Sequence, residues 1–294
     1  MNMERVVLSM LPSPIRQAVA GAISMFGGHY EELRLYRGGR IRVLHAGRSV
    51  YAPGQCSPED FDRTLRNLCG NSLYSHSETM REGYVITADG LRVGICGRAV
   101  LRRGEVDLIT DITSLCIRIP GRYPEIARPF MPYILTKSGV NGMLVYSAPG
   151  VGKTTLLREL ADLLSSPEFG LRCAVVDTRM EIGFGLTGAS LHLLRGYPRA
   201  LGMETAVRTL SPDLVICDEI SDEKDADAVL YCASSGAAVI ASAHAAGYED
   251  LLRKPALARL LKNRVFAART ELFRQDGTVC RRITMENGEQ SCAV

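Results

Sequence analysis

The pattern of apolar and polar positions changes near the middle of the chain. Up to residue 119, short apolar and β-branched runs alternate with turns, which indicates strands. Asp89-Gly90 separates two of these runs and is typical of a hairpin turn. Ser57, followed by apolar residues at helical spacing, predicts a capped amphipathic helix. Residues 1–119 are therefore expected to form a small α+β domain. The expected strands are 41–44, 84–87, 91–95 and 115–119.

Residues 138–294 show a different pattern, in which short apolar runs alternate with amphipathic helices. The run at 143–147 ends in a glycine-rich turn, and leucines then recur on one face of a helix. Polar or small residues bound each further run, as is typical of buried parallel strands. This alternation predicts a parallel sheet with helices on both faces. The further runs are 173–177, 214–218 and 238–242.

Prolines mark the stretch between these two patterns. Four prolines and one glycine fall within 119–132, and they interrupt both the strand-like and the helical periodicity. At 294 residues, the chain is about twice the usual length of a domain, so two domains are the default expectation. We therefore predict a linker over 120–137, between a first domain at 1–119 and a second at 138–294.

Composition excludes several broad classes of protein. With 46% hydrophobic and 23% charged residues, the chain is not a wholly disordered one. Its nine cysteines include no C-x-x-C pair, which suits a reducing compartment better than a disulfide framework. No apolar stretch approaches the roughly 20 residues of a membrane span, and prolines interrupt the N-terminal stretch where a secretion signal needs an apolar core. We expect a cytosolic protein that can still dock on a membrane.

The net charge of +3 is unevenly distributed. Residues 1–140 carry 18 basic and 13 acidic side chains, whereas residues 141–294 carry 17 basic and 19 acidic ones. All but one of the basic residues in the first stretch are arginines, whose rigid fork of donors suits phosphate or carboxylate. The excess indicates either a surface that faces phosphates or a partner, or an ordinary solvated basic surface.

The strongest chemical signal is the sequence SAPGVGKTT at 147–155, between an expected strand and an expected helix. Small residues let backbone N–H groups wrap a phosphate, and the helix N-terminus adds favourable partial charge. Lys153 would reach the β- and γ-phosphates of ATP, and Thr154 would hold Mg²⁺. The usual motif begins with glycine, whereas this one begins with Ser147, which a left-handed backbone would disfavour. The expected nucleotide-binding residues are Ser147, Ala148, Pro149, Gly150, Val151, Gly152, Lys153, Thr154 and Thr155.

A pair of acids provides the second signal. Asp218 stands at the carboxyl end of the expected strand 214–218, where an Mg²⁺-anchoring aspartate belongs. Glu219 follows directly, and we expect it to be the general base that polarises the attacking water. A helix cap is the alternative for two acids in this position. Because Asp218 lies 65 residues after Lys153 in the same α/β half, the ATPase interpretation is preferred.

Further polar residues follow other strands and should emerge at the same edge of the sheet. Glu181, four residues after Asp177, could steer water or metal, and Arg179 could contact phosphate. The alternative is a helix-capping aspartate followed by a surface glutamate. Ser242 and His244 could sense the γ-phosphate, although His244 could equally be an ordinary loop histidine.

No arginine within one subunit can be assigned to the γ-phosphate. Arg208 is either structural or reaches a phosphate across a subunit boundary, and the basic first half offers Arg81, Arg92 and Arg98. A cation supplied in trans can contribute on the order of 10³–10⁵ in rate. We therefore expect a homo-oligomer in which one subunit completes the ATP site of the next.

These residues together resemble a known family, the stage III sporulation protein AA ATPases of endospore-forming bacteria, which are related to the ATPases of type II and type IV secretion. In the second half the resemblance rests on APGVGKTTLLREL, VVDTRMEI, AVRTLSPDLVICDEIS and ASAH. In the first half it rests on EELRLYRGGR, SLYSHSETMREGYVITADGLRVGICGRAV and ITSLCIRI. It covers nearly the whole chain.

The resemblance implies a RecA-like P-loop ATPase domain of the α/β class behind a smaller α+β domain. By position it makes Asp218 and Glu219 the Walker B pair, Asp177 and Glu181 an acidic box, and His244 the histidine element of secretion ATPases. Thr178 stands where the family usually has glutamate, so this acidic box is weaker.

The resemblance also implies partners and a location for the protein. It implies a homo-oligomeric ring, with a hexamer as the candidate size, that hydrolyses ATP in the cytoplasm of the mother cell. The ring would sit at the inner face of a membrane and energise a complex built with the other stage III A sporulation proteins.

Two other functions remain as alternatives. The arginine-rich first half suggests a nucleic-acid-dependent ATPase, but few aromatics lie near its arginines to stack on bases, so we do not expect a nucleic-acid partner. An inactive nucleotide-binding scaffold is indicated only by Ser147 and Thr178. A GTPase is disfavoured because the chain has no N-K-x-D motif, and Glu219 suits activation of water better than that of a kinase substrate.

Overall fold

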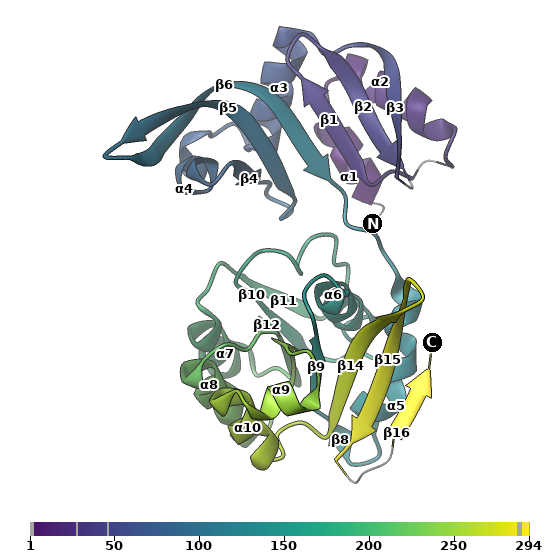
Figure 1. The fold of residues 1–294 in the computed structure, drawn as a ribbon, viewed down its shortest axis with the longest axis vertical. Helices are drawn as coiled ribbons and strands as arrows, with labels where there is room; N and C mark the ends of the chain where they lie inside the picture. The colour runs from purple at the N-terminus through teal and green to yellow at the C-terminus, as the bar shows by residue number, and fades with distance from the viewer. Residues whose placement is uncertain (1–2, 28, 46, 287–289, 294) are drawn as a thin grey trace. The chain divides into compact units, whose positions relative to one another are not determined.

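The computed structural model describes residues 3–27, 29–45, 47–286 and 290–293, and Figure 1 shows its fold. The chain divides into two compact units, Met1–Gly121 and Arg122–Val294. In each unit, helices pack on a large mixed or antiparallel sheet. The α/β class that the pattern predicted is confirmed.

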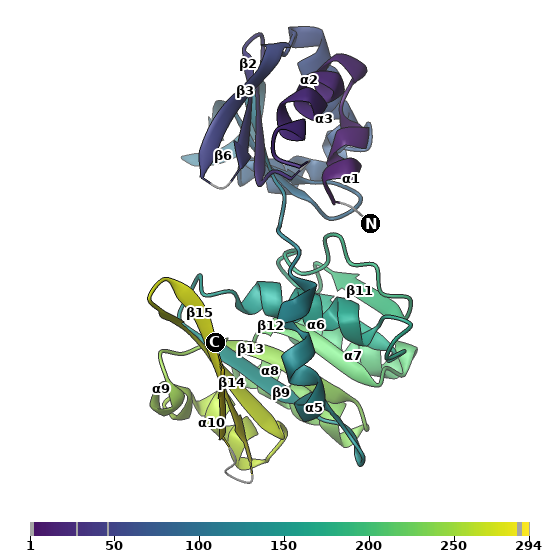
Figure 2. The same ribbon diagram turned by 90° about the vertical axis from the view of Figure 1, so that its right-hand side faces the viewer.

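The first unit is built on a six-stranded antiparallel sheet in the order β3-β2-β1-β6-β5-β4. Figure 2 shows α1, α2 and α3 on one face of its β1–β3 part. The strands expected from the sequence correspond to β2, β4, β5 and β6, whereas β1 and β3 were not predicted. The strands are β1 Glu32–Tyr36, β2 Arg40–His45, β3 Arg48–Gln55, β4 Tyr84–Ile86, β5 Arg92–Arg102 and β6 Glu105–Arg118. The helices are α1 Met3–Met10, α2 Ser13–Ser24, α3 Pro58–Leu68 and α4 Ser77–Arg81.

Two local signals in this unit are confirmed. The Ser57 hydroxyl accepts the Asp60 N–H at 3.1 Å and so caps α3, whose Phe61 side chain lies in the core. Gly90 adopts φ +88° in the turn between β4 and β5, and the two strands pair antiparallel. Both signals act within a few residues, which is why the sequence alone reveals them.

The second unit is built on an eight-stranded sheet in the order β11-β10-β12-β13-β9-β14-β15-β16. The strands from β11 to β14 are parallel, as predicted, and β15 and β16 continue the sheet antiparallel. The strands are β9 Met143–Ser147, β10 Cys173–Asp177, β11 Leu191–Arg195, β12 Leu214–Glu219, β13 Ala238–His244, β14 Ala268–Gln275, β15 Thr278–Met285 and β16 Gln290–Ala293.

Alternate side chains of β9 face the two helical layers of this unit. Met143 and Val145 pack against leucines of α6, and Leu144 packs with residues of α7, α8 and α10 on the other face. The helices are α6 Lys153–Leu164, α7 Arg199–Leu210, α8 Glu223–Ser234, α9 Tyr248–Leu252 and α10 Pro255–Lys262. A parallel sheet covered on both faces is therefore present, as the alternation predicted.

The connection between the units differs from the linker predicted over 120–137. Residues 122–134 form short helices, η2 Pro124–Ile126, η3 Arg128–Phe130 and α5 Met131–Ile134. Proline stands in the first turn of each, where its fixed φ is favourable and its missing N–H has no cost. Ala127, Phe130 and Ile134 are buried in the core of the second unit. A short antiparallel pair, β7 Leu135–Thr136 and β8 Gly139–Val140, follows.

No helix in the described part of the chain is both long enough and apolar enough to cross a bilayer. The cysteines at positions 56, 69, 96, 116, 173, 217, 232 and 280 are all free, and Cys173 and Cys217 are buried in the second sheet. Burial raises the pKa of the Cys173 thiol to about 12, which makes it an inert core residue.

Candidate functional site

The loop 147–155 connects β9 to α6 at the carboxyl edge of the second sheet. Its left-handed positions are Gly150, at φ +74°, and Gly152, at φ +118°, where a side chain would be strained. Ser147 belongs to β9 and pairs with His244 of β13, so its backbone is extended. The strain that a serine would suffer in a left-handed loop therefore does not arise at this position.

Lys153 occupies the concave side of this loop. Its Nζ donates to the carbonyl oxygens of Ser147 and Ala148 at 3.0 and 3.2 Å, and to the Ser147 hydroxyl at 3.1 Å. Burial lowers the pKa of Lys153, and the nearby Glu219 carboxylate opposes that shift. The ammonium is thus held above the loop by neutral oxygens, which a phosphate could replace.

His244 joins Lys153 to the end of β12. Its Nδ1 lies 2.9 Å from Lys153 Nζ, and its Nε2 lies 3.1 Å from a carboxylate oxygen of Glu219. Because an ammonium can only donate, Nδ1 accepts and Nε2–H donates to Glu219. Arg179 Nη1 approaches the same Glu219 oxygen at 3.8 Å. These contacts orient the carboxylate that the sequence predicts to be the base.

Asp218 stands at an irregularity in the pairing of β12 with β13. The register shifts between Cys217 and Glu219, and such a bulge re-aims the side chains around it. The Asp218 carboxylate accepts a hydrogen bond from Arg199 Nε at 2.8 Å. Burial raises the pKa of Asp218, and the Arg199 charge offsets part of that shift.

Arg199 is the site residue that sequence reasoning missed. It begins α7, and its side chain is only 10% exposed. Besides Asp218 it contacts Asp225, in the first turn of α8, and thereby links both acids to one guanidinium. A cation at a helix N-terminus opposes the helix dipole, so its place in the sequence carries a weak signal that it has an acidic partner elsewhere.

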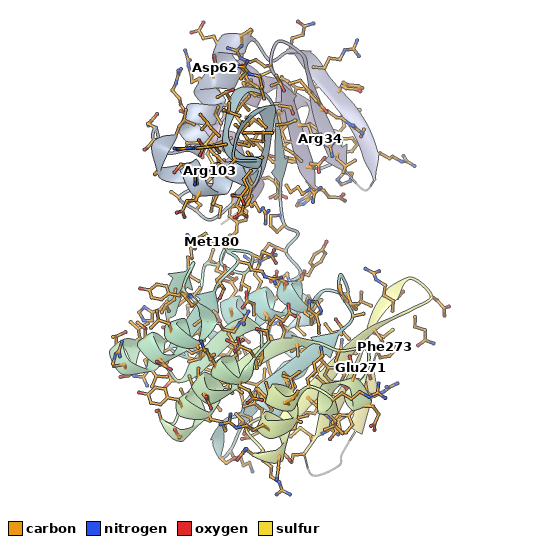
Figure 3. The ribbon with its side chains drawn as sticks, turned by 60° about the vertical axis from the view of Figure 1, so that its left-hand side comes forward. Arg34, Asp62, Arg103, Met180, Glu271 and Phe273 are labelled. Atoms are coloured by element: carbon orange, nitrogen blue, oxygen red, sulfur yellow. The ribbon has the colours of Figure 1, made fainter. Side chains whose placement is uncertain are left out.

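Asp177 plays a different part from the one its position suggested. It is fully buried, and its carboxylate accepts the N–H groups of Glu181, Ile182 and Gly183 at 2.9, 3.0 and 2.7 Å. It therefore caps the loop that follows β10, which is the structural alternative for this acid. Met180, labelled in Figure 3, adopts φ +56° inside that loop, a conformation that the cap helps to hold.

The same loop is fixed from the side of α6. The guanidinium of Arg158, a buried residue of that helix, donates to the carbonyl oxygens of Glu181 and Ile182. The backbone of Glu181 is thus held at both its N–H and its C=O, while its exposed side chain lines the cavity described below. Thr178, which follows Asp177 in this loop, has a buried hydroxyl with no hydrogen-bond partner among the described residues.

These elements surround a cavity of about 400 Å³. It brings together most of the residues that the sequence singled out. Four of the predicted nucleotide-binding residues do not line this cavity, namely Ser147, Ala148, Pro149 and Val151. The lining residues are Gly150, Gly152, Lys153, Thr154, Thr155, Arg179, Glu181, Asp218, Glu219, Ser242 and His244.

The arginines proposed to act in trans are not among the residues that line this cavity. Arg208 is exposed near the C-terminal end of α7, about 13 Å along the helix axis from Arg199. In the first unit, Arg81 and Arg98 pair with Asp107 and Asp111, and the Arg92 guanidinium lies 3.7 Å from the centroid of the Tyr84 ring.

The cavity suits Mg²⁺ better than a metal that needs many protein ligands. Its candidate ligands, the Thr154 hydroxyl and the Asp218 carboxylate, are oxygens, with the Glu181 and Glu219 carboxylates nearby. No cluster of three or more His, Cys, Asp or Glu side chains placed to hold a metal occurs in the described ranges. Mg²⁺ usually takes only one or two carboxylates and completes its shell with phosphates and water. The residues present therefore fit this ion.

Comparison with known proteins relates the chain to sporulation proteins in sequence and to solved ATPase structures in fold. A family model described as sporulation stage III, protein AA, matches residues 2–289. Stage III sporulation protein AA of Bacillus subtilis (strain 168) is 33% identical over 281 residues, which cover 92% of this chain and 91% of that protein.

Solved structures share the fold at low sequence identity. The Legionella pneumophila ATPase DotB superposes with a TM-score of 0.62 at 16% identity, over 94% of this chain and 81% of that one. The pilus retraction motor PilT, solved with bound ADP, gives a TM-score of 0.63 at 15% identity, over 92% and 81%. These likenesses show that the chain shares the fold of these two structures.

Proposed function

The chain belongs to the sporulation stage III protein AA family, and from this premise we propose that it is an Mg²⁺-dependent ATPase that drives a secretion-like membrane complex. The observation that carries the proposal is the convergence of Lys153, Asp218 and Glu219 on one cavity at the carboxyl edge of the sheet. Lys153 begins α6, whereas Asp218 and Glu219 end β12, so two elements that lie far apart in the sequence supply these residues.

Nucleotide binding follows from the loop and its lysine. The backbone N–H groups of 150–154 and the N-terminus of α6 would take the phosphates. Lys153 Nζ would exchange the carbonyl oxygens of Ser147 and Ala148 for phosphate oxygens, which carry full negative charge and bind an ammonium more strongly. Thr154 and Asp218 would hold Mg²⁺, which neutralises charge on the β- and γ-phosphates when bound.

Hydrolysis then needs a base and an oriented water. Glu219 accepts a hydrogen bond from His244 Nε2 and faces the cavity, so its carboxylate can take the proton of an attacking water. His244 also contacts Lys153, so movement of Lys153 onto a phosphate would change the partner of His244 Nδ1 and could signal occupancy to the base. Glu181, whose backbone is fixed, is the second carboxylate able to orient this water.

The active form that we propose is a homo-oligomeric ring, with a hexamer as the candidate size. Arg199 is hydrogen-bonded to Asp218, and Arg179 lies near Glu219. Neither of these two arginines is therefore placed to bind the γ-phosphate. Arg208 is exposed, and its side chain has no hydrogen bond or ion pair among the described residues, so it is free to reach a neighbour's site. The ring would work in the mother-cell cytoplasm, docked on membrane proteins of the stage III A complex.

The test of this proposal begins with Lys153→Ala. Removing the charge opposite the phosphates should abolish binding of a non-hydrolysable ATP analogue in calorimetry, while Lys137→Ala, at an exposed turn, should bind like the parent. Unchanged affinity in Lys153→Ala would show that the loop is not the nucleotide site.

Two further measurements separate the remaining alternatives. Hydrolysis that rises with single-stranded DNA or RNA would favour a nucleic-acid-dependent ATPase, and binding without hydrolysis would favour a scaffold.

If arginines act in trans, mixing Lys153→Ala with Arg208→Ala subunits should recover activity that neither has alone. A specific activity that is flat across dilution, with no recovery on mixing, would indicate a self-sufficient monomer.

A further inference from the structure

We propose that one face of the first unit's sheet, the arginine face, binds an extended acidic segment of a partner protein. Side chains alternate between the two sides of each strand, and the buried Leu33, Leu35, Ile41 and Val43 mark the side that carries the helices (Figure 2). The arginine face is the other side of these strands. The proposal rests on the proposed function in one respect, because it gives the docked motor a surface for a protein of its complex.

Five arginines and one glutamate are the charged side chains of this face among the described strand residues, apart from the β5–β6 hairpin beyond Cys96. Strand pairing places them together, since Arg34 lies opposite Arg42 and Glu32 lies opposite Arg118. Part of the arginine excess in the first half of the sequence is therefore gathered on one surface, which attracts ligands of opposite charge. The arginines are Arg40 and Arg42 of β2, Arg34 of β1, Arg118 of β6 and Arg92 of β5.

Glu32 shows that the arginine face stabilises a carboxylate. Its two oxygens accept hydrogen bonds from Arg34 Nε at 2.5 Å and from Arg118 Nε at 3.1 Å. Burial alone would raise the pKa of Glu32, but hydrogen bonds from Arg34, Cys116 and Arg118 lower it below its usual value. The Arg118 side chain is nevertheless 76% exposed, and its contact with Glu32 is made by Nε. Its Nη groups can therefore bind a second carboxylate.

Two tyrosines support further guanidinium groups on this face. The Arg92 guanidinium lies 3.7 Å from the centroid of the Tyr84 ring, and that of Arg40 lies 5.3 Å from the centroid of the Tyr51 ring. A guanidinium that stacks on a ring keeps its N–H donors in its own plane, where they can bind an anion. Because these two rings are already stacked with arginines, they are not bare platforms for nucleic-acid bases. The arrangement favours carboxylates over bases as ligands.

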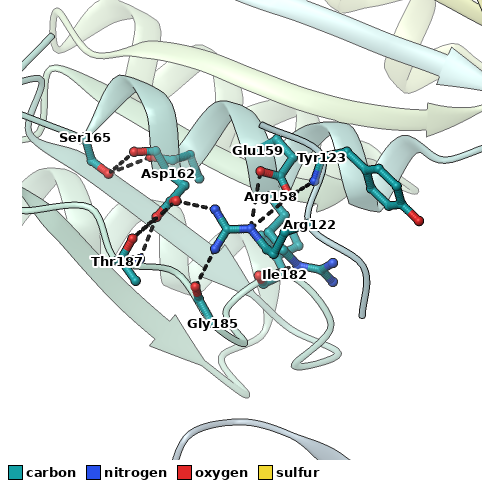
Figure 4. Close-up of polar contacts among 10 residues, drawn as sticks. Arg122, Tyr123, Arg158, Glu159, Asp162, Ser165, Ile182, Gly185 and Thr187 are labelled. Carbon is teal, nitrogen blue, oxygen red and sulfur yellow. Dashed lines mark hydrogen bonds and ion pairs between the residues drawn. The ribbon is translucent and has the colours of Figure 1, made fainter. Parts of the chain in front are cut away.

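An arginine with a purely structural role has different surroundings, as Arg122 of the second unit shows (Figure 4). Its Nε donates to both oxygens of Glu159 at 3.0 and 3.3 Å, and its guanidinium also pairs with Asp162. Arg42 on the arginine face instead donates to the neutral hydroxyl of Ser49, at 2.8 and 2.6 Å. A carboxylate that replaced this hydroxyl would form stronger, charge-assisted hydrogen bonds.

The spacing of the arginines suits a ligand with several separated charges. Arg42, Arg34 and Arg118 stand on the adjacent strands β2, β1 and β6, and neighbouring strands lie about 4.8 Å apart. A single carboxylate or phosphate group cannot contact all of these strands, whereas an extended polypeptide with several carboxylates can. Arginine and tyrosine are also side chains that are enriched where proteins bind one another. The observations therefore favour an acidic protein segment.

The experiment measures binding of a fluorescent poly-glutamate peptide to the full chain by anisotropy at physiological salt. The double variant Arg40→Ala with Arg42→Ala should weaken binding about tenfold, because two cation–carboxylate contacts are lost. The matched control, Arg16→Ala with Arg66→Ala, removes the same charge from exposed positions of α2 and α3 and should bind the peptide like the parent.

The ring that supports Arg40 is tested separately. Tyr51→Phe keeps this ring and should bind the peptide like the parent, whereas Tyr51→Ala should weaken binding by a smaller factor than the double arginine variant. Arg34 and Arg118 stay unchanged in all variants, because their removal would leave the buried Glu32 carboxylate without its cations.

Several results would overturn the proposal. An equal loss in the control double variant would show that net charge alone attracts the peptide, and a parent that does not bind the peptide would remove the site. Tighter binding of single-stranded DNA, or of vesicles that contain phosphatidylserine, would assign the face to nucleic acid or to a lipid surface. Failure of the proposed function is distinguishable, because Lys153→Ala should lose the ATP analogue and still bind the peptide like the parent.

Discussion

Two neighbouring strands of the second sheet carry an aspartate as their last or last-but-one residue, and the two acids have different roles. Asp177 ends β10, is fully buried, and gives its carboxylate to three backbone N–H groups of the following loop. Asp218, near the end of β12, faces the cavity and is held by the side chain of Arg199. A carboxylate that accepts hydrogen bonds from the backbone of the following loop has a structural role. A carboxylate that is bound by a side chain can exchange that side chain for a ligand.

The backbone after each strand explains this difference. Beyond β10 the chain curls back, so that the amides of Glu181, Ile182 and Gly183 point at Asp177. At β12 the pairing register shifts between Cys217 and Glu219, which leaves Asp218 without a partner in the ladder and free to turn toward the cavity. The two sequences, VVDT and ICDE, do not reveal which of these backbones will follow.

The largest effect that we expect is on the hydrolysis rate, and it distinguishes Glu219 at the end of β12 from Glu181 in the loop after β10. Glu219→Gln keeps the shape and most of the hydrogen bonding of the side chain but removes its basicity. ATP binding should persist, and the hydrolysis rate should fall on the order of 10²–10⁴-fold. Glu181→Gln, in the loop after β10, should lower the rate less. Parental turnover in Glu219→Gln would instead move the base to Glu181.

The next prediction concerns stability. Asp177→Ala would leave three N–H groups without this acceptor, and the two that are buried should cost about 1–3 kcal/mol each, so unfolding in urea should become easier by about 2 kcal/mol or more. Asp218→Ala should cost much less, because Arg199 keeps Asp225 as a partner and one buried carboxylate is removed. If the two substitutions destabilise the protein equally, the distinction between the acids is wrong.

A third prediction uses pH to probe the side-chain partner of Asp218. Burial raises the pKa of this carboxyl, so the folded protein takes up its proton at a higher pH than the unfolded chain does. Folding is therefore slightly favoured, and Mg²⁺ binding is lost, as the pH falls through the folded pKa. Arg199 opposes the shift, so Arg199→Ala should raise that pKa further and move the acid limb of hydrolysis to higher pH.

Two variants control this pH experiment. Arg199→Lys keeps the charge beside Asp218 and should shift the acid limb less than Arg199→Ala. Arg172→Ala breaks an exposed ion pair with Asp213, outside the cavity, and should leave the profile of hydrolysis unchanged. An acid limb that does not move in Arg199→Ala would mean that a different group limits activity at low pH.

The sequence predicts those parts of the site whose determinants are local. The phosphate loop is a continuous strand, glycine turn and helix, and each of its residues is informative beside its neighbours. Arg199 meets Asp218 19 residues later, and Tyr123 meets Glu159 36 residues later, so neither contact leaves a periodic trace in the sequence. The choice between cap and ligand for Asp177 depends likewise on a backbone turn that no motif specifies.

The fold follows the same rule. Buried parallel strands are continuous apolar runs, and β9, β10, β12 and β13 were predicted nearly to their ends. Strand β3 was missed because most of its residues are exposed and its sequence, RSVYAPGQ, carries both proline and glycine. The prolines after residue 119 predicted a linker, because a proline that begins a short helix and one that breaks a helix look alike until the core is known.

The smallest effect is expected at the end of a third strand, β9, where Ser147 replaces the usual glycine. Its backbone is extended, and its hydroxyl donates to the Ala148 carbonyl at 2.7 Å and accepts from Lys153. Ser147→Gly should therefore change affinity for the ATP analogue and the hydrolysis rate by about tenfold at most, since a lost hydrogen bond costs roughly 0.5–1.5 kcal/mol net. Gly150→Ala, at φ +74°, provides the contrast and should weaken analogue binding more, because the strain falls on the backbone that wraps the phosphates. A large gain of hydrolysis in Ser147→Gly would show that the serine holds Lys153 away from the nucleotide, and would favour a scaffold over a motor.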